Sequence, residues 1–196
     1  LQFILKNFSI RPGTRALYKK VLSDPSIASR RFALKDLKEV LDENPDTINR
    51  RFEREAVALS AQALKKALRG AKLSPKSIDF LAVSTCTGYL CPGLSTRLIE
   101  ASDLRRDVHS ADIVGMGCGS AIPAMEAAHN FIKANPKSIA ATVSTEICSA
   151  AMFSDDSADL VISNSIFADG SAAAILSNSA SQGPAEILRF GAVTHP

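Results

Sequence analysis

A cysteine, Cys118, directly follows a Gly-Met-Gly turn in the stretch ADIVGMGCGSAIPAMEAAHNF, residues 111–131. The run before it is apolar and strand-like, and the small residues after it predict a helix to about Ala134. Glycines permit a sharp turn and a close approach of backbone to ligand. A thiol in the first helical turn faces the positive end of the helix dipole, which favours the thiolate. The free backbone N–H groups there can hold a thioester oxyanion. The pattern therefore predicts a nucleophile for acyl transfer, with a small buried thiol in tight packing as the alternative.

The other three cysteines, Cys86, Cys91 and Cys148, show no metal-binding spacing. Cys86 and Cys91 are separated by Thr-Gly-Tyr-Leu, and no Cys-x-x-Cys occurs in the chain. We expect no metal site, and we expect reduced thiols in a cytoplasmic protein.

The composition is that of an ordinary globular chain. Of its 196 residues, 46% are hydrophobic and 22% are charged, which is enough to form a core. The net charge of +3 is too small to indicate a nucleic-acid partner. No uninterrupted apolar run approaches the ~20 residues of a membrane span, so none is predicted.

Helical periodicity alternates with strand-like runs along most of the chain. We expect helices over residues 1–9, 14–23, 35–41, 48–69, 92–102, 118–134 and 157–166. In the long helix at 48–69, Asp46 or Thr47 is the expected N-cap and Gly70 the expected end.

Five strands are predicted between these helices, over residues 77–85, 107–115, 138–145, 170–178 and 185–193. Strands that alternate with helices predict an α/β sheet covered on both faces. The Ser-Gln-Gly-Pro turn predicts a hairpin between the last two strands, so the sheet should be mixed.

Four segments carry a resemblance to a known family. They read STCTGYLCPG at 84–93, GMGCGSAIPA at 115–124, VSTEIC at 143–148 and NSIFADGSAAAIL at 164–176. In order and spacing they resemble the type III polyketide synthases, the chalcone-synthase-like family of the thiolase superfamily, over about residues 14–194. The resemblance implies a thiolase-like fold of αβαβα layers, of which residues 1–196 form a partial, N-terminal domain with the C-terminal half absent.

The resemblance also implies roles for individual residues. Cys118 stands where the family carries the growing acyl chain. Cys91 stands where the family reaches across a homodimer toward the partner's site. Seven residues stand where the family lines its substrate pocket: Cys86, Thr87, Gly88, Glu146, Cys148, Ala151 and Phe167. Phe167 stands at the position of the family's gate residue.

The implied reaction is a decarboxylative Claisen condensation. An acyl-CoA starter acylates Cys118, malonyl-CoA loses carbon dioxide, and the resulting carbanion attacks the thioester over several rounds. The implied substrates are acyl-CoA and malonyl-CoA, with no metal, prosthetic group or other cofactor. The family binds CoA phosphates with basic residues near the N-terminus, and the candidates here are Lys19, Lys20, Arg30 and Arg31. A solvated helix face is the alternative for these charges.

The chain departs from the family in one important way. The family's catalytic His and Asn lie in the C-terminal half, and this chain ends before them, so we expect the 196 residues alone to be inactive and to need that half as a partner. His195 comes too early in the order to be the catalytic His, whereas His109 and His129 are expected to be structural.

Two pocket positions differ from the plant pattern. Cys148 and Ala151 replace threonines, which favours an aliphatic starter and alkylpyrone or alkylresorcinol products. Two other functions stay open: a ketoacyl-acyl-carrier-protein synthase of the third kind, and a non-catalytic thiolase-fold dimerisation module.

Overall fold

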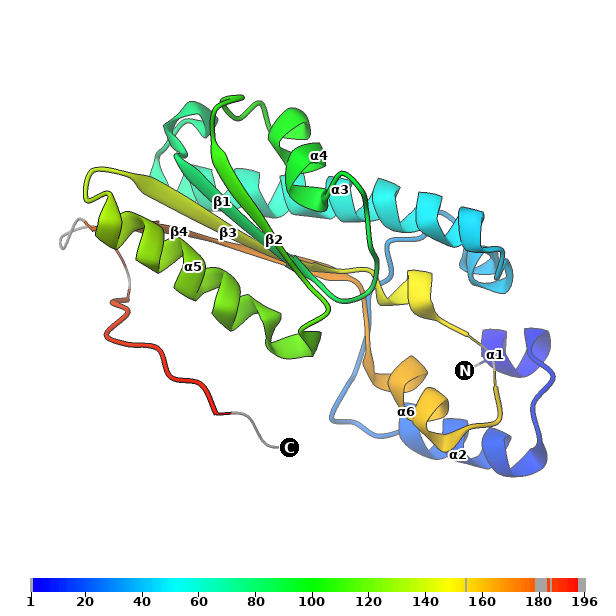
Figure 1. Cartoon of the computed structure of the whole chain (residues 1–196). Coiled ribbons are helices and arrows are strands. Elements are labelled where there is room, and N and C mark those ends of the chain that lie inside the picture. The colour runs from blue at the N-terminus through cyan, green and yellow to red at the C-terminus, as the bar shows by residue number, and fades with distance from the viewer. Residues whose placement is uncertain (1, 154, 179–182, 184, 194–196) are drawn as a thin grey trace.

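A four-stranded mixed sheet lies at the centre of the molecule (Figure 1). The computed structural model describes residues 2–153, 155–178, 183 and 185–193. The strands are β1 (Phe80–Thr85), β2 (His109–Val114), β3 (Ile139–Glu146) and β4 (Gly170–Ser177), in the order β2-β1-β3-β4. β1 runs parallel to β2 and β3, whereas β4 runs antiparallel to β3.

The two central strands are buried on both faces, as parallel strands between helices must be. Successive side chains point to opposite faces. Leu81 and Val83 therefore join a core on one face, whereas Phe80 packs in a smaller cluster on the other. The predicted strands at 77–85, 107–115, 138–145 and 170–178 are confirmed, with ends shifted by a few residues.

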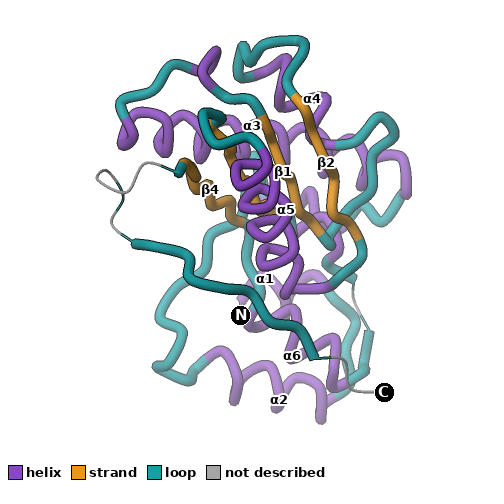
Figure 2. The backbone as a smooth tube through the Cα atoms, turned by 60° about the vertical axis from the view of Figure 1, so that its left-hand side comes forward, coloured by secondary structure: helices purple, strands orange, loops and turns teal. Residues whose placement is uncertain are grey.

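Helices cover both faces of the sheet (Figures 1 and 2). α3 (Pro45–Ala71) and α4 (Leu94–Ala101) lie on one face, where α3 contacts β3 and β4 and α4 contacts β1 and β2. α5 (Ala121–Ala134) lies on the other face and contacts β1, β3 and β4. The predicted α/β class with helices on both faces is therefore confirmed.

A second group of helices lies beside the sheet layers (Figure 1). α1 (Gln2–Asn7), α2 (Pro12–Leu22) and α6 (Ala158–Ile166) pack around Ile4, Tyr18 and Val161. Asp156 fixes the start of α2, because its carboxylate accepts hydrogen bonds from the Arg11 backbone N–H at 2.8 Å and the Thr14 hydroxyl at 2.7 Å. The chain passes directly from α6 of this group into β4 of the sheet.

Four 3-10 helices complete the elements that the structure describes: η1 (Leu37–Leu41), η2 (Pro75–Ser77), η3 (Gly117–Ser120) and η4 (Cys148–Ala151). The helix predicted over 35–41 is thus a 3-10 helix. A capping box of Asp36 and Glu39 lies at its N-terminal end. The two turns at η3 and η4 carry predicted site residues.

The predicted N-cap of α3 is wrong by two or three residues. Asn44 caps the helix, and its side-chain oxygen accepts from the backbone N–H groups of Asp46 and Thr47. The helix can begin at Pro45 because a first-turn N–H has no partner within the helix, so its loss costs nothing there. The predicted end at Gly70 is also early, since Lys72 takes the left-handed C-cap conformation with φ 56°.

The predicted strand at 185–193 and its hairpin are wrong. The described residues of this segment form no strand, and Leu188 and Val193 are each 83% exposed. A strand needs a partner edge, and this segment instead passes over α5, where Ile187 packs against the cluster of Ala128 and Ile132. The sheet is mixed, as predicted, but the antiparallel pairing of β3 and β4 makes it so.

Candidate active site

Three loops that carry predicted site residues meet at one edge of the sheet. β1, β2 and β3 are parallel, so their carboxyl ends lie at the same edge, the usual ligand position in α/β sheets. Cys86 follows β1, Cys118 follows β2 and Cys148 follows β3. Their thiols lie close enough to influence one another electrostatically. The structure therefore brings three of the four cysteines together, as the resemblance implies.

Cys118 lies in the turn between β2 and α5. The chain leaves β2 through Gly115 at φ +79° and Gly117 at φ +67°. A Cβ atom at either position would meet no neighbouring atom within 4 Å, so the left-handed backbone, and not lack of space at the Cβ, favours glycine there. Cys118 itself is exposed and belongs to the 3-10 turn η3. The predicted start of the helix at Cys118 is thus three residues early, because α5 begins at Ala121.

Glu146, at the end of β3, binds the loop that follows β1. Its carboxylate accepts hydrogen bonds from the backbone N–H groups of Cys86, at 2.9 Å, and Thr87, at 3.0 Å. It also accepts from the Thr87 hydroxyl at 2.7 Å, and that hydroxyl accepts from the backbone N–H of Ile147 at 2.8 Å. The side chain of Glu146 therefore fixes the conformation of the Cys86–Gly88 loop.

Gly88 is needed for close packing in the same loop. A Cβ at this position would lie within 2.5 Å of ring atoms of Phe52. Phe52 belongs to α3 and is 1% exposed, so its ring cannot move aside without opening the core. Gly88 thus anchors the loop to the hydrophobic core beneath it.

Two of the three thiols are held in the neutral form. Partial desolvation, helped by the hydrogen bond and charge of Glu146, raises the pKa of Cys86 to about 12. Desolvation, followed by the negative charges of Asp169 and Glu146, raises the pKa of Cys148 to about 11. The thiolate is the nucleophilic form, so Cys86 and Cys148 are poor nucleophiles at neutral pH. Cys118 is the remaining thiol at this edge.

Ala151 and Phe167 lie on two segments next to Cys148. Ala151 ends η4, the turn that begins at Cys148, and Phe167 is the C-cap residue of α6. Both are exposed, Phe167 to 46%. The turn and the Phe167 segment are joined by Asp169, whose carboxylate accepts from the Ser149 backbone N–H at 2.8 Å.

Cys91 lies further along the loop between β1 and α4 and is exposed. The loop returns to the sheet through Asp112 of β2, whose carboxylate accepts from the backbone N–H of Ser95 at 2.9 Å and from its hydroxyl. A Cβ on Gly93 would collide with this carboxylate. The helix start after Cys91 is therefore fixed to the edge strand.

Part of the basic N-terminal region borders a surface hollow. Lys20 and Arg30 line a cavity of about 440 Å³, together with Ser165 and Ile166. The Arg30 guanidinium donates to the Asn164 backbone oxygen at 2.6 Å, and burial lowers its pKa. Lys19 and Arg31 are exposed and do not line the hollow. The structure thus brings two of the four basic candidates together.

The described histidines lie against aromatic rings. The ring of His109 lies 5.4 Å from that of Phe131, and the ring of His129 lies 5.4 Å from that of Phe190. His109 is at the start of β2, and Cys118 follows the end of that strand. These contacts agree with the structural roles expected for both, and His195 lies outside the described residues.

The described part of the chain contains no group of three His, Cys, Asp or Glu side chains arranged to hold a metal ion. Its helices also include none with the length and apolar character needed to cross a membrane.

Comparison with known proteins assigns this arrangement to a family. The family model described as FAE1/type III polyketide synthase-like protein matches residues 6–191. The chain belongs to this family. The resemblance read from the four sequence segments is therefore confirmed.

Relatives within the type III polyketide synthase-like family include two bacterial enzymes. The chain is 33% identical over 158 residues to the alpha-pyrone synthesis polyketide synthase-like protein Pks18 of Mycobacterium tuberculosis, covering 77% of this chain and 40% of that protein. It is 32% identical over 101 residues to 1,3,6,8-tetrahydroxynaphthalene synthase of Streptomyces griseus, covering 52% of this chain and 27% of that protein.

Solved structures of the family share the fold. The C-terminal type III polyketide synthase domain of Steely1 from Dictyostelium superposes with a TM-score of 0.80 at 28% identity, covering 90% of this chain and 50% of that one. The tetrahydroxynaphthalene synthase of Streptomyces coelicolor gives a TM-score of 0.75 at 26% identity, covering 86% and 47%. The thiolase-like fold class is confirmed, and the chain spans half the length, or less, of these relatives.

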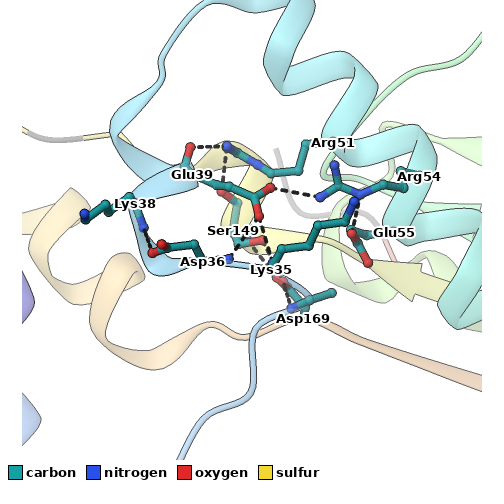
Figure 3. A network of polar contacts seen from close by, with 10 residues as sticks. Lys35, Asp36, Lys38, Glu39, Arg51, Arg54, Glu55, Ser149 and Asp169 are labelled. Carbon is teal, nitrogen blue, oxygen red and sulfur yellow. Dashed lines mark hydrogen bonds and ion pairs between the residues drawn. The ribbon is translucent and has the colours of Figure 1, made fainter.

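Sequence reasoning missed a polar network that supports the site (Figure 3). Arg51 of α3 is 2% exposed and donates to the backbone oxygens of Ser149, at 3.0 Å, and Glu39. Asp169 binds the same Ser149 from the other side. Two features of the sequence could have indicated this network. One is an arginine, Arg51, within an apolar-periodic helix. The other is the aspartate of the FADGS motif, in which we assigned a role only to Phe167.

Proposed function

We propose that the protein is an acyltransferase that condenses an acyl-CoA starter with malonyl-CoA units, and that Cys118 carries the acyl chain. Membership of the type III polyketide synthase-like family carries this proposal. The site supports it, because Cys118 is exposed at the carboxyl edge of the parallel strands, whereas the neighbouring Cys86 and Cys148 are held neutral.

The proposed chemistry balances without a metal or prosthetic group. The Cys118 thiolate attacks the starter thioester, forms a new thioester and releases the CoA thiolate. Malonyl-CoA loses carbon dioxide, and the electron pair left on carbon attacks the Cys118 thioester. A carbon–carbon bond forms, the carbon–sulfur bond breaks, and the Cys118 thiolate is regenerated. Transfer of the lengthened chain from CoA back to Cys118 begins the next round.

The neutral thiols and the small side chains are proposed as walls of the acyl pocket. A thiol behaves as a small hydrophobic group when it is protonated. Cys86 and Cys148 would then contact the chain without competing for it, next to Thr87, Gly88 and Ala151. Phe167 would lie at the pocket entrance, and Glu146 would act by holding the Cys86–Gly88 loop, as its hydrogen bonds support.

The hollow beside Lys20 and Arg30 is proposed as part of the CoA site. CoA carries phosphates, which lysine and arginine bind by charge-assisted hydrogen bonds. Lys19 and Arg31 would add charge at the rim, although Arg30 is partly engaged with Asn164.

An aliphatic starter and a pyrone or resorcinol product are proposed for this pocket. Cys148 and Ala151 offer small, apolar walls, and a relative is named for alpha-pyrone synthesis. Faster turnover of a short aromatic acyl-CoA than of a long-chain one would contradict this part.

Two features of the assembly are also proposed. The protein would form a homodimer in which Cys91 reaches toward the partner's site, since Cys91 is exposed beside the edge strand. A reactive thiol needs a reducing compartment, so we propose a cytoplasmic location.

The test is to trap the acyl-enzyme. The protein, at the full length that its gene encodes, is exposed to acyl-CoA without malonyl-CoA and analysed by peptide mass spectrometry. We expect the acyl group on Cys118, no acyl group in Cys118→Ala, and unchanged loading in Cys91→Ala. Acylation of Cys86 in place of Cys118, or of all thiols equally, would refute the proposal and favour a non-catalytic module.

A second measurement separates the proposal from the remaining enzyme alternative. We expect free malonyl-CoA to support chain extension. A strict requirement for malonyl-acyl-carrier protein would instead indicate a ketoacyl-acyl-carrier-protein synthase.

A further inference from the structure

One carboxylate, that of Asp169, joins three segments that are far apart in the sequence. It accepts from the backbone N–H of Ser149 at 2.8 Å, from the Ser149 hydroxyl at 2.6 Å and from the backbone N–H of Ala33 at 2.7 Å. The backbone N–H of Asp169 itself donates to the Arg31 oxygen at 2.9 Å. Hydrogen bonds to an ionised acceptor are stronger than neutral ones, so these contacts strongly constrain all three segments.

The first segment is the η4 turn, in which each polar group of the central residue, Ser149, makes a hydrogen bond. Ser149 is fully buried. Asp169 takes its N–H and hydroxyl, and the buried Arg51 takes its carbonyl oxygen (Figure 3). The contacts made at Ser149 therefore help to place Cys148 and Ala151 on either side, and the Cys148 thiol also meets the backbone N–H of Ala168.

The second segment carries Phe167, two residues before Asp169. Phe167 lies between the end of α6 and the first residue of β4, so Asp169 is the first side chain after it that is fixed to another part of the molecule. Any change in the position of Asp169 moves Phe167 relative to the η4 turn.

The third segment, residues 30–33, borders the hollow lined by Lys20 and Arg30. It is attached to the α6–β4 region at both ends. Arg30 donates to the Asn164 oxygen at 2.6 Å, and Ala33 and Arg31 bond to Asp169. The same carboxylate thus connects the hollow to the proposed pocket wall.

We propose that Asp169 is a positioning residue that holds the Cys148–Ala151 turn, Phe167 and the 30–33 segment in one fixed arrangement and thereby sets the number of chain extensions. This inference rests on the proposed function. Asp169 does not hold Cys118, which belongs to the turn after β2. Its loss should therefore spare loading of the starter and impair extension, since misplacement of about 1 Å costs up to ~100-fold in rate.

The test compares Asp169→Asn with Asp79→Asn in the full-length protein. Asp79 is a matched control because its carboxylate also accepts from a backbone N–H, that of Ile139 at 2.9 Å, but lies at the opposite edge of the sheet, before β1. We expect both variants to lower the thermal midpoint. Only Asp169→Asn should lower kcat for malonyl-CoA consumption, by about 10- to 100-fold, and shift the ratio of products of different length. Acylation of Cys118 should stay within about 3-fold of wild type in both.

Hydrogen exchange gives a readout that needs no activity. In Asp169→Asn, amides of residues 31–33, 147–151 and 167–170 should lose protection together, whereas Asp79→Asn should leave them unchanged. Should Asp169→Asn fail to fold, Ser149→Ala removes one hydrogen bond only and should change the product ratio in the same direction. A wild-type protein that neither loads nor extends would refute the proposed function, while exchange would still decide whether Asp169 joins the segments.

The inference is overturned by either of two results. One is an Asp169→Asn protein with the kcat and product ratio of Asp79→Asn. The other is equal loss of loading and extension, in step with loss of folded protein, which would show a stabilising role alone.

Discussion

The thiols at the carboxyl edge should differ sharply in their rates of alkylation, and this prediction can be tested at once. Relative to an unperturbed thiol of pKa 9.0, the pKa of Cys86 is raised to about 12 and that of Cys148 to about 11. Near neutral pH the thiolate fraction therefore falls about 1000-fold and about 100-fold. A more basic thiolate is also more nucleophilic, with a Brønsted coefficient of about 0.45, which recovers part of the loss. Alkylation should be about 40-fold slower at Cys86 and about 10-fold slower at Cys148.

The assay is a time course with iodoacetamide at pH 7.5, read by peptide mass spectrometry, with an unstructured cysteine peptide as reference. Cys118 should be alkylated before both. Alkylation of Cys86 at the rate of the peptide would refute the reasoning, because its thiol would then be neither desolvated nor influenced by Glu146.

The variant Glu146→Gln separates the two causes of the shift at Cys86. It removes the negative charge and keeps one of the two acceptor oxygens that hold the loop, and desolvation is the largest single cause of the raised pKa. Alkylation of Cys86 should therefore rise several-fold without reaching the rate of the peptide. Glu100→Gln, an exposed carboxylate on α4, is the matched control and should change nothing. A rise to the full peptide rate would show that charge, and not desolvation, dominates.

Three further predictions concern stability and activity. Gly88→Ala should destabilise the protein by about 1–3 kcal/mol in urea unfolding, since its Cβ overlaps the Phe52 ring, whereas Gly13→Ala, with open space in α2, should not. The raised pKa of Cys148 favours its protonated form in the folded state, so stability should fall as pH rises from about 9 to about 11, and the unfolding midpoint of Cys148→Ala should vary less over that range. The isolated 196-residue chain should be alkylated at Cys118 but should not consume malonyl-CoA, since no described histidine lies at the carboxyl edge of the sheet; product formation by this chain would contradict this reasoning.

The elements that were predictable from sequence are those whose pattern is local. Buried parallel strands such as 77–85 read as continuous apolar runs, and long amphipathic helices such as 48–69 keep helical spacing over many turns. The segment 185–193 has an equally clear strand pattern and forms no strand. Pairing with a free edge is a property of the whole sheet, and local alternation contains no information about it.

The grouping of Cys86, Cys118 and Cys148 was predictable for a different reason. Each follows a strand, and parallel strands bring their carboxyl ends together, so position in the sequence translates directly into position in space. The electrostatic difference among the three thiols was not predictable. It depends on how far each thiol is desolvated and on the carboxylates of Glu146 and Asp169. Those carboxylates are held by contacts with residues 20 to 136 positions away in the sequence.

The carboxylates of Glu146 and Asp169 have a role in the structure that the sequence did not indicate. Glu146 belongs to a motif for which the resemblance implies contact with substrate, and Asp169 lies two residues after Phe167. In the structure, the oxygens of both carboxylates accept hydrogen bonds from backbone N–H and hydroxyl groups. A carboxylate that accepts three or more hydrogen bonds from fixed loops has little capacity left for proton transfer. We conclude that the two carboxylates hold loops at the carboxyl ends of the strands and that the proposed reaction would take its acid–base groups from elsewhere. Replacing either carboxylate should therefore change the shape of the proposed pocket before it changes acylation of Cys118.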